Sequence, residues 1–369
     1  MTRPYRVVVA PDKFKGSLDA EAVTETIAGV LSRRPGVEIV KHPVADGGEG
    51  TVDVALAVGF DPIEAPVTGP LGRPVVATFA TRGDTAVIEM ASAAGLALLP
   101  NGPDPDTAWR ATTYGVGELI RAALERGATQ VVVGAGGSAT TDGGEGALRA
   151  LSLDVVELGR QHSSSTTSRR RLDARLPEVD LVVACDVDNP LVGPGGAAAV
   201  YAPQKGADPR CVAALERRVV AWADAVADVV DHDLRHMPGA GAAGGLAFGL
   251  VAVAGARLVS GVELLLDLTG FNDVAAGADL VIVGEGSLDR QSLRGKGPVG
   301  VARAASRRGA TVLAVAGRNE LTEAEQREAG LGAVYSLSDL ESDPEICMRD
   351  ARRLLETVAD NIASDWLDQ

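Results

Sequence analysis

The chain is poor in aromatic residues, cysteine, histidine and long apolar runs, and each shortage excludes a class of protein. Only 3% of its 369 residues are aromatic, so the core must be built from Val, Leu, Ala and Ile. The three cysteines, Cys185, Cys211 and Cys347, show no Cys-x-x-Cys spacing, which argues against a zinc site and favours reduced thiols in a cytoplasm. The longest apolar stretch, residues 246–256, is well short of the roughly 18 residues of a membrane span. The amino end passes directly into a strand pattern without a signal peptide. We therefore expect a cytoplasmic globular protein.

The charge balance limits the partners of the chain. A net charge of −15, from 35 basic and 50 acidic residues, argues against nucleic acid and against an anionic membrane surface. An anionic substrate would meet overall repulsion, so its site must be built locally from lysines and backbone dipoles. A homodimer is compatible with this composition.

Lysine is scarce, and its positions are informative. The chain has five lysines, and four of them lie in loops rich in Gly, Pro and Asp. A compact ammonium and a planar guanidinium are not interchangeable, so we interpret Lys15, Lys205 and Lys296 as positions that need the smaller group. The alternative is that they are ordinary surface lysines.

The two ends of the chain alternate strand and helix patterns, which predicts an α/β fold with a doubly wound parallel sheet. Residues 1–60 and 281–369 together supply about five strands, whereas neither end alone would make a sheet. We therefore predict one discontinuous domain with residues 61–280 inserted as a mixed α/β domain. Within the insert we expect a hairpin across Arg82-Gly83-Asp84 and an almost wholly apolar, buried helix over 244–258, and the polar run at 161–171 predicts a surface loop.

A loop with six glycines follows the predicted strand Gln130–Val133. It runs from Gly134 to Gly146 and also contains Ser138, Thr140 and Asp142. Glycine allows backbone N–H groups to approach a ligand closely, and such loops after strands commonly bind phosphate. The alternatives are a tight structural turn or, from Gly134-x-Gly136-x-x-Ala139, a dinucleotide-binding turn.

Four further loops combine small residues with a carboxylate or lysine at the end of a predicted strand. They are residues 10–17, 45–51, 184–190 and 284–297. Because ligands bind at the carboxyl ends of parallel strands, we expect these loops and the glycine loop to meet at one site between the domains. These five loops contain no histidine, and the chain has no G-x-x-x-x-G-K-[ST] motif, which argues against a Ser-His-Asp hydrolase and a P-loop. Carboxylate, lysine, hydroxyl and backbone amide are the groups that phosphoryl transfer uses.

At these loops the chain resembles the bacterial glycerate kinases of type I, the family similar to glycerate 2-kinases. The resemblance runs almost end to end through nine segments: 10–18, 45–51, 67–72, 112–119, 136–144, 184–191, 203–206, 238–245 and 284–298. It implies ATP-dependent phosphorylation of D-glycerate at the 2-hydroxyl, with Mg²⁺ as cofactor. It also implies a flavodoxin-like domain with an inserted restriction-enzyme-like domain. The family usually has a longer, glycine-containing segment where this chain has residues 151–176.

This resemblance and the loops together give each residue an expected role. We predict that Asp186 or Asp289 accepts the hydroxyl proton, and that Asp46 and Glu285 hold Mg²⁺ or contact the ribose. Lys15, Lys205 and Lys296 would stabilise the transferring charge. Ser138, Thr140 and the surrounding amides would hold either the ATP phosphates or the glycerate carboxylate. The remaining predicted binding residues are Ser17, Gly47, Gly48, Gly136, Gly137, Asp142, Asn189 and Gln291. The alternatives are a kinase of another small hydroxy acid and a non-catalytic ligand sensor.

Overall fold

The computed structural model describes residues 3–152, 173–230, 232–290, 292–294 and 297–368. These residues form two compact units, and each is described by itself. Unit 1 comprises residues 1–46, 53–58 and 261–369, and unit 2 comprises residues 47–52 and 59–260. The predicted surface loop at 161–171 lies outside the described residues. Within the described chain, no helix is both long enough and apolar enough to cross a membrane.

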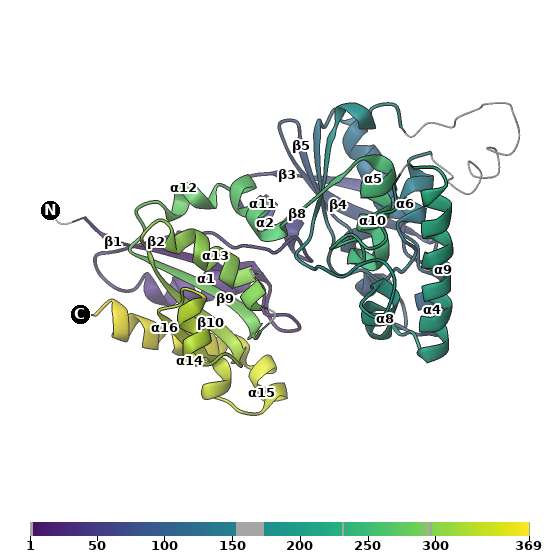
Figure 1. The fold of residues 1–369 in the computed structure, drawn as a ribbon. Helices are drawn as coiled ribbons and strands as arrows, with labels where there is room; N and C mark the ends of the chain where they lie inside the picture. The colour runs from purple at the N-terminus through teal and green to yellow at the C-terminus, as the bar shows by residue number, and fades with distance from the viewer. Residues whose placement is uncertain (1–2, 153–172, 231, 291, 295–296, 369) are drawn as a thin grey trace, which may run out of the picture. The chain divides into compact units, whose positions relative to one another are not determined.

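Unit 1 is built on a five-stranded parallel sheet (Figure 1). Its strands are β1 (Tyr5–Pro11), β2 (Val37–Lys41), β9 (Leu280–Leu288), β10 (Thr311–Asn319) and β11 (Ala333–Ser336). Their order is β11-β10-β9-β1-β2, and all four pairings are parallel. The chain adds strands on one side of β1 first and on its other side afterwards, so the strand order reverses between β1 and β9. This is the 2-1-3-4-5 order of doubly wound sheets such as flavodoxin.

Helices cover both faces of this sheet, as a parallel sheet requires. Alternate strand residues point to opposite faces, so Val7 and Val9 pack with helices α1 (Ala20–Leu31) and α16 (Ala351–Trp366). Val8 and Ala10 pack on the other face, with α11 (Gly261–Leu268), α12 (Phe271–Ala275) and α13 (Gly297–Ser306). The remaining helices associated with this part of the chain are α2 (Thr51–Ala57), α14 (Glu323–Glu328) and α15 (Pro344–Arg349).

Unit 2 is built on a six-stranded mixed sheet in the order β3-β4-β5-β6-β7-β8. Its strands are β3 (Asp61–Thr68), β4 (Pro74–Arg82), β5 (Thr85–Glu89), β6 (Gln130–Gly134), β7 (Asp180–Ala184) and β8 (Arg257–Val259). The first three are antiparallel, and β5 to β8 are parallel. The helices are α3 (Ala91–Ala94), α4 (Pro105–Arg110), α5 (Tyr114–Glu125), α6 (Glu145–Ala150), α8 (Ala197–Tyr201), α9 (Pro209–Ala227) and α10 (Ala242–Ala254). Apolar side chains of α5, α6 and α10 share one core with the strands.

The predicted α/β class and the hairpin of β4 and β5 are confirmed. The division of the chain differs from the predicted boundary at residue 281, because residues 261–280 belong to unit 1. Helices α11 and α12 bring Val262, Leu266 and Phe271 into the core of that unit. The sequence of a short amphipathic helix shows that one face is buried, but it does not show which sheet that face packs against.

The predicted helix over 244–258 is wrong at both ends. Helix α10 ends at Ala254, because Gly255 adopts a left-handed conformation (φ 74°) that terminates a helix, and β8 follows. At the other end Gly244 and Gly245 also have positive φ, so the regular helix starts after them.

Candidate functional site

Four carboxylates gather at the carboxyl ends of three adjacent strands of unit 1, and we call them the carboxylate cluster. Asp12 follows β1, Asp46 lies beyond β2, Glu285 is in the last part of β9, and Asp289 follows β9. Strands β1 and β9 are neighbours, and the strand order reverses between them. In open α/β sheets the ligand site lies at this reversal.

The charges of the cluster repel one another in a poorly solvated place. The pKa of Asp12 is raised to about 7, mainly by burial and also by the charge of Asp46, while Lys13 opposes the rise. Burial, together with the charges of Asp12, Asp289 and Asp46, also raises the pKa of Glu285, to about 8. The hydroxyl of Ser292 donates a hydrogen bond of 2.5 Å to Glu285 Oε1, which partly offsets this repulsion. The arrangement therefore favours a cation or a proton.

The donor set of the cluster suits Mg²⁺, which prefers carboxylate oxygens. Across the described residues, no three His, Cys, Asp or Glu side chains are arranged as a ready-made metal site. In kinases Mg²⁺ is usually held by one or two carboxylates together with water and substrate phosphates. The carboxylate oxygens present fit a magnesium ion by their chemistry.

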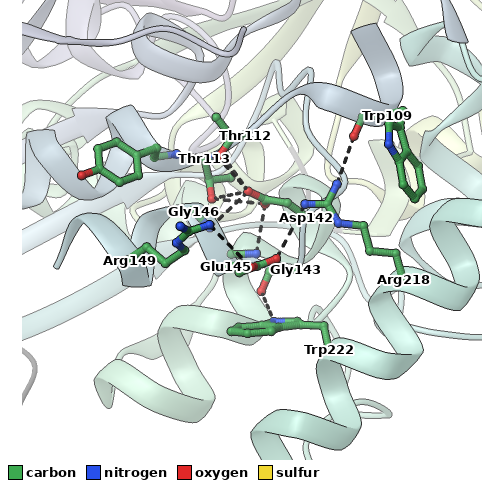
Figure 2. A network of polar contacts seen from close by, with 12 residues as sticks. Trp109, Thr112, Thr113, Asp142, Gly143, Glu145, Gly146, Arg149, Arg218 and Trp222 are labelled. Carbon is green, nitrogen blue, oxygen red and sulfur yellow. Dashed lines mark hydrogen bonds and ion pairs between the residues drawn. The ribbon is translucent and has the colours of Figure 1, made fainter. Parts of the chain in front are cut away.

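The glycine loop of unit 2 is organised by Asp142, which is almost completely buried (Figure 2). Its carboxylate accepts hydrogen bonds from Thr113 N (2.8 Å) and Thr113 Oγ1 (2.9 Å) at the start of α5. It also accepts from Gly144 N (3.1 Å) and Gly146 N (3.3 Å) in its own loop. Trp222 of α9 donates to the neighbouring Gly143 O at 2.9 Å. Asp142 thus folds the loop, and its predicted contact with a ligand stays a prediction.

The glycines of this loop are also needed for close packing against other backbone segments. A Cβ on Gly136 would lie 2.4 Å from Gly48 Cα, and a Cβ on Gly134 would lie 2.8 Å from Gly47 O. On the other side, a Cβ on Gly244 would lie 1.9 Å from Thr140 O. Close backbone contact alone therefore explains part of the glycine content. This is what we expect if the loop is a tight structural turn, the alternative to a ligand-binding loop.

Lys205 is hydrogen-bonded to the middle of the glycine loop within unit 2. It ends the short 3₁₀ helix Pro203–Lys205, and its side chain is buried. Nζ donates to Ser138 Oγ at 2.7 Å and to Thr140 O at 2.6 Å. Burial lowers the pKa of Lys205 to about 7, although the charge of Asp142 opposes this. Three predicted site residues, Lys205, Ser138 and Thr140, are thus brought together.

The loop after β7 holds Asp186 and Asn189, each engaged within unit 2. Ser260 Oγ donates to Asp186 Oδ1 at 2.9 Å. Asn189 donates to Gly195 O at 2.9 Å and accepts from the Tyr201 hydroxyl at 2.5 Å. Asn189 therefore orders its own loop, and the choice between Asp186 and Asp289 as base stays open.

The predicted site residues thus fall into two groups. Unit 1 contains Lys15, Ser17, Asp46, Glu285 and Asp289, and unit 2 contains Gly47, Gly48, Gly136, Gly137, Ser138, Thr140, Asp142, Asp186, Asn189 and Lys205. Lys296 and Gln291 lie outside the described residues. Convergence of all five loops on one site stays a prediction.

Two acidic residues were missing from the predicted site. Asp12 belongs to the carboxylate cluster, and its position directly after β1 was a signal that could have identified it. Glu89 ends β5 and is buried; its Oε2 accepts from Gly50 N at 2.8 Å and so holds the loop that contacts Gly134 and Gly136. The sequence spacing of 39 residues between Glu89 and Gly50 gave no such signal.

The model of the glycerate kinase family matches residues 7–367 of the chain. The chain is 41% identical to a glycerate kinase of Bacillus subtilis over 97% of both chains. It is 40% identical to a glycerate 2-kinase of Escherichia coli over 90% of both. A crystal structure described as a candidate glycerate kinase 2 from Salmonella typhimurium shares 36% identity and a TM-score of 0.76, over 98% of this chain and 99% of the other. Together with the carboxylate cluster at the reversal of the sheet and the glycine loop, these similarities show that the chain is a kinase and belongs to the glycerate kinase family.

Proposed function

We propose that this protein transfers the γ-phosphoryl group of ATP to the 2-hydroxyl of D-glycerate. The observation that carries the proposal is the carboxylate cluster, whose mutual repulsion a divalent cation would relieve. Glycerate kinases and a glycerate 2-kinase among the relatives support the substrate, since they match over nearly the whole chain.

The carboxylates of unit 1 would hold the metal, and one carboxylate of either unit would accept the proton. Glu285 and Asp46 would hold Mg²⁺, and Ser292 orients Glu285 through its hydrogen bond. When bound, the ion neutralises charge on the phosphate oxygens. Asp289 or Asp186 would accept the proton of the attacking hydroxyl as the new O–P bond forms, with ADP as the leaving group. Lys15 and Lys296 would offset the negative charge of the moving phosphoryl group.

The glycine loop of unit 2 would supply backbone N–H groups for an anionic group of a substrate. Its shape is fixed by Asp142 and Lys205, so its amides are held in place before a ligand arrives. Such preorganisation matters because donors that need not rearrange stabilise charge at lower cost. Lys205 thus acts as a positioning residue, because its ammonium faces the loop interior.

The test is an ADP-release assay with ATP, Mg²⁺ and D-glycerate, followed by phosphorus NMR of the product. We expect turnover that stops when Mg²⁺ is removed, and a phosphate on C2. Turnover with other small hydroxy acids in place of D-glycerate would change the assigned substrate. Binding without turnover of any hydroxy acid would instead favour a ligand sensor and contradict the proposal.

The location and assembly of the protein are lesser parts of the proposal. Cys185, Cys211 and Cys347 are free thiols, which supports a reducing cytoplasm. A homodimer stays a prediction, and light scattering of the purified protein tests it.

A further inference from the structure

Unit 1 contains an apolar pocket, and we propose that it binds the purine nucleoside part of the phosphoryl donor. This inference rests on the proposed function, which requires a nucleotide. The pocket has a volume of about 220 Å³. Its lining residues follow or end four strands: Phe14, Lys15 and Ser17 after β1, Gly286 and Ser287 in β9, Gly317 and Arg318 in β10, and Leu337 and Ser338 after β11. Residues of α15 and its flanks close the other side.

The pocket lies at the carboxyl end of the same sheet as the carboxylate cluster. Gly286 and Ser287 line the pocket, and the preceding residue, Glu285, belongs to the cluster. Alternate residues of a strand point to opposite faces of a sheet, and Glu285 has the parity of Val283, on the face opposite to the pocket. The phosphates of a nucleotide seated in the pocket would therefore extend across the carboxyl end of β9 to reach the residues that would hold Mg²⁺. The volume is below the roughly 300–1,000 Å³ typical of a site for a whole drug-sized ligand, so the pocket suits one flat part of a nucleotide.

The chemistry of the lining fits a heteroaromatic ring better than glycerate. Phe14, Leu337 and Cys347 are buried apolar residues of the pocket. Met348 is 49% exposed where it lines the pocket, and its flexible, polarisable thioether suits contact with an aromatic ring. Glycerate is small, anionic and rich in hydroxyls, so this surface offers it little. The guanidinium of Arg318 is already paired with Glu320 at 2.8 Å.

Polar groups in the pocket have capacity for a ligand. Ser287 Oγ is buried and has no hydrogen-bond partner among the described residues, which is costly for a native hydroxyl. The hydroxyl of Ser338 and the carboxylate of Glu341 also line the pocket and can accept hydrogen bonds from an exocyclic amine. Gly286 and Gly317 keep the base of the pocket free of side chains; a Cβ on Gly317 would lie 2.4 Å from Gly286 O.

The experiment compares three substitutions around this pocket. Met348→Ala removes the exposed apolar contact, and Ser342→Trp places an indole at an exposed lining position. Leu340→Ala is the matched control, because Leu340 is 44% exposed and does not line the pocket. We expect the KM for ATP to rise about tenfold in the first two variants, a change of about 1.4 kcal/mol, with the KM for D-glycerate unchanged. Leu340→Ala should leave both unchanged.

Binding of two ligand fragments separates the nucleoside from the phosphates. Adenosine should bind the wild type in competition with ATP, and Met348→Ala and Ser342→Trp should weaken its binding about tenfold. Inorganic tripolyphosphate should bind all three variants as it binds the wild type. If Ser342→Trp does not fold, Met348→Ala alone decides.

The inference is overturned if both variants keep the wild-type KM for ATP and the wild-type affinity for adenosine. That result would leave the proposed function intact, provided the wild type phosphorylates D-glycerate. Conversely, adenosine binding that depends on Met348, in a protein without kinase activity, would support the pocket and reject the proposed function.

Discussion

The carboxylate cluster of unit 1 and the glycine loop of unit 2 differ in how their buried carboxylates are compensated. Asp142 accepts hydrogen bonds from Thr113, Gly144 and Gly146, so its charge is satisfied by its own unit. Glu285 has one short bond from Ser292 and is repelled by three other carboxylates. A satisfied buried carboxylate stabilises a fold, whereas a group of repelled carboxylates is stabilised by what binds to it. The difference indicates which acidic residues serve structure and which serve chemistry.

The largest expected effect is the loss of turnover in Glu285→Gln. The substitution keeps the size of the side chain and removes the charge that would hold Mg²⁺, so we expect kcat to fall about 10²–10³-fold. Stability at neutral pH should not fall, because a pKa of about 8 already favours the neutral carboxyl group, which the neutral amide resembles. Steady-state ADP release measures kcat, and Glu320→Gln is the control, an exposed carboxylate just after β10. A variant with more than one tenth of the wild-type kcat would exclude Glu285 from the chemistry.

The next effect concerns stability in unit 2. Asp142→Asn replaces a carboxylate by an amide whose NH₂ group would face the N–H groups of the loop and Thr113, so we expect a loss of about 3 kcal/mol in the free energy of unfolding. Urea denaturation measures this loss. The matched control is Asp106→Asn, an exposed carboxylate paired with Arg110 on α4, which should change stability by less than about 0.5 kcal/mol. Equal stability of the two variants would remove Asp142 from its proposed structural role.

The smallest effect is a pH dependence that comes from Lys205. Its pKa is about 7 in the folded protein, below the ordinary value of 10.5, so between these values the unfolded chain binds one more proton than the folded one. The free energy of unfolding therefore rises by about 1.4 kcal/mol per pH unit in this range because of Lys205. This contribution is lost as the pH falls toward 7. Lys205→Met should lack this dependence. Urea denaturation of both proteins from pH 7.5 to 9.5 gives the difference in slope, and parallel slopes would contradict it.

The sequence predicted strands such as β1 and β9 because each contains a short run of β-branched apolar residues, which is typical of a strand buried on both faces. It missed β3, which contains Pro62 and Pro66 and has alternating burial. Prolines lower the expectation of a strand, but β3 lies at the edge of its sheet, where a missing N–H is tolerated. The position of a strand at the edge of a sheet depends on the tertiary fold, so the local sequence pattern does not reveal it.

The sequence was sufficient to predict which loops contain the candidate site residues. It was not sufficient to predict what each residue does there. Gly134, Gly136 and Lys205 were singled out because their residue types are unusual in that context. Their partners, Gly47, Gly48 and Thr140, come from distant segments, so only the fold shows that the glycines pack against backbone. Similarly, Asp142 and Glu285 look alike in sequence, and they differ only in the donors and charges that the fold brings to them.

The most direct test measures kcat and the free energy of unfolding for Glu285→Gln and Asp142→Asn in parallel. We predict that Glu285→Gln loses turnover at unchanged or higher stability, and that Asp142→Asn loses stability. The account is contradicted if Glu285→Gln keeps its turnover, or if it loses as much stability as Asp142→Asn.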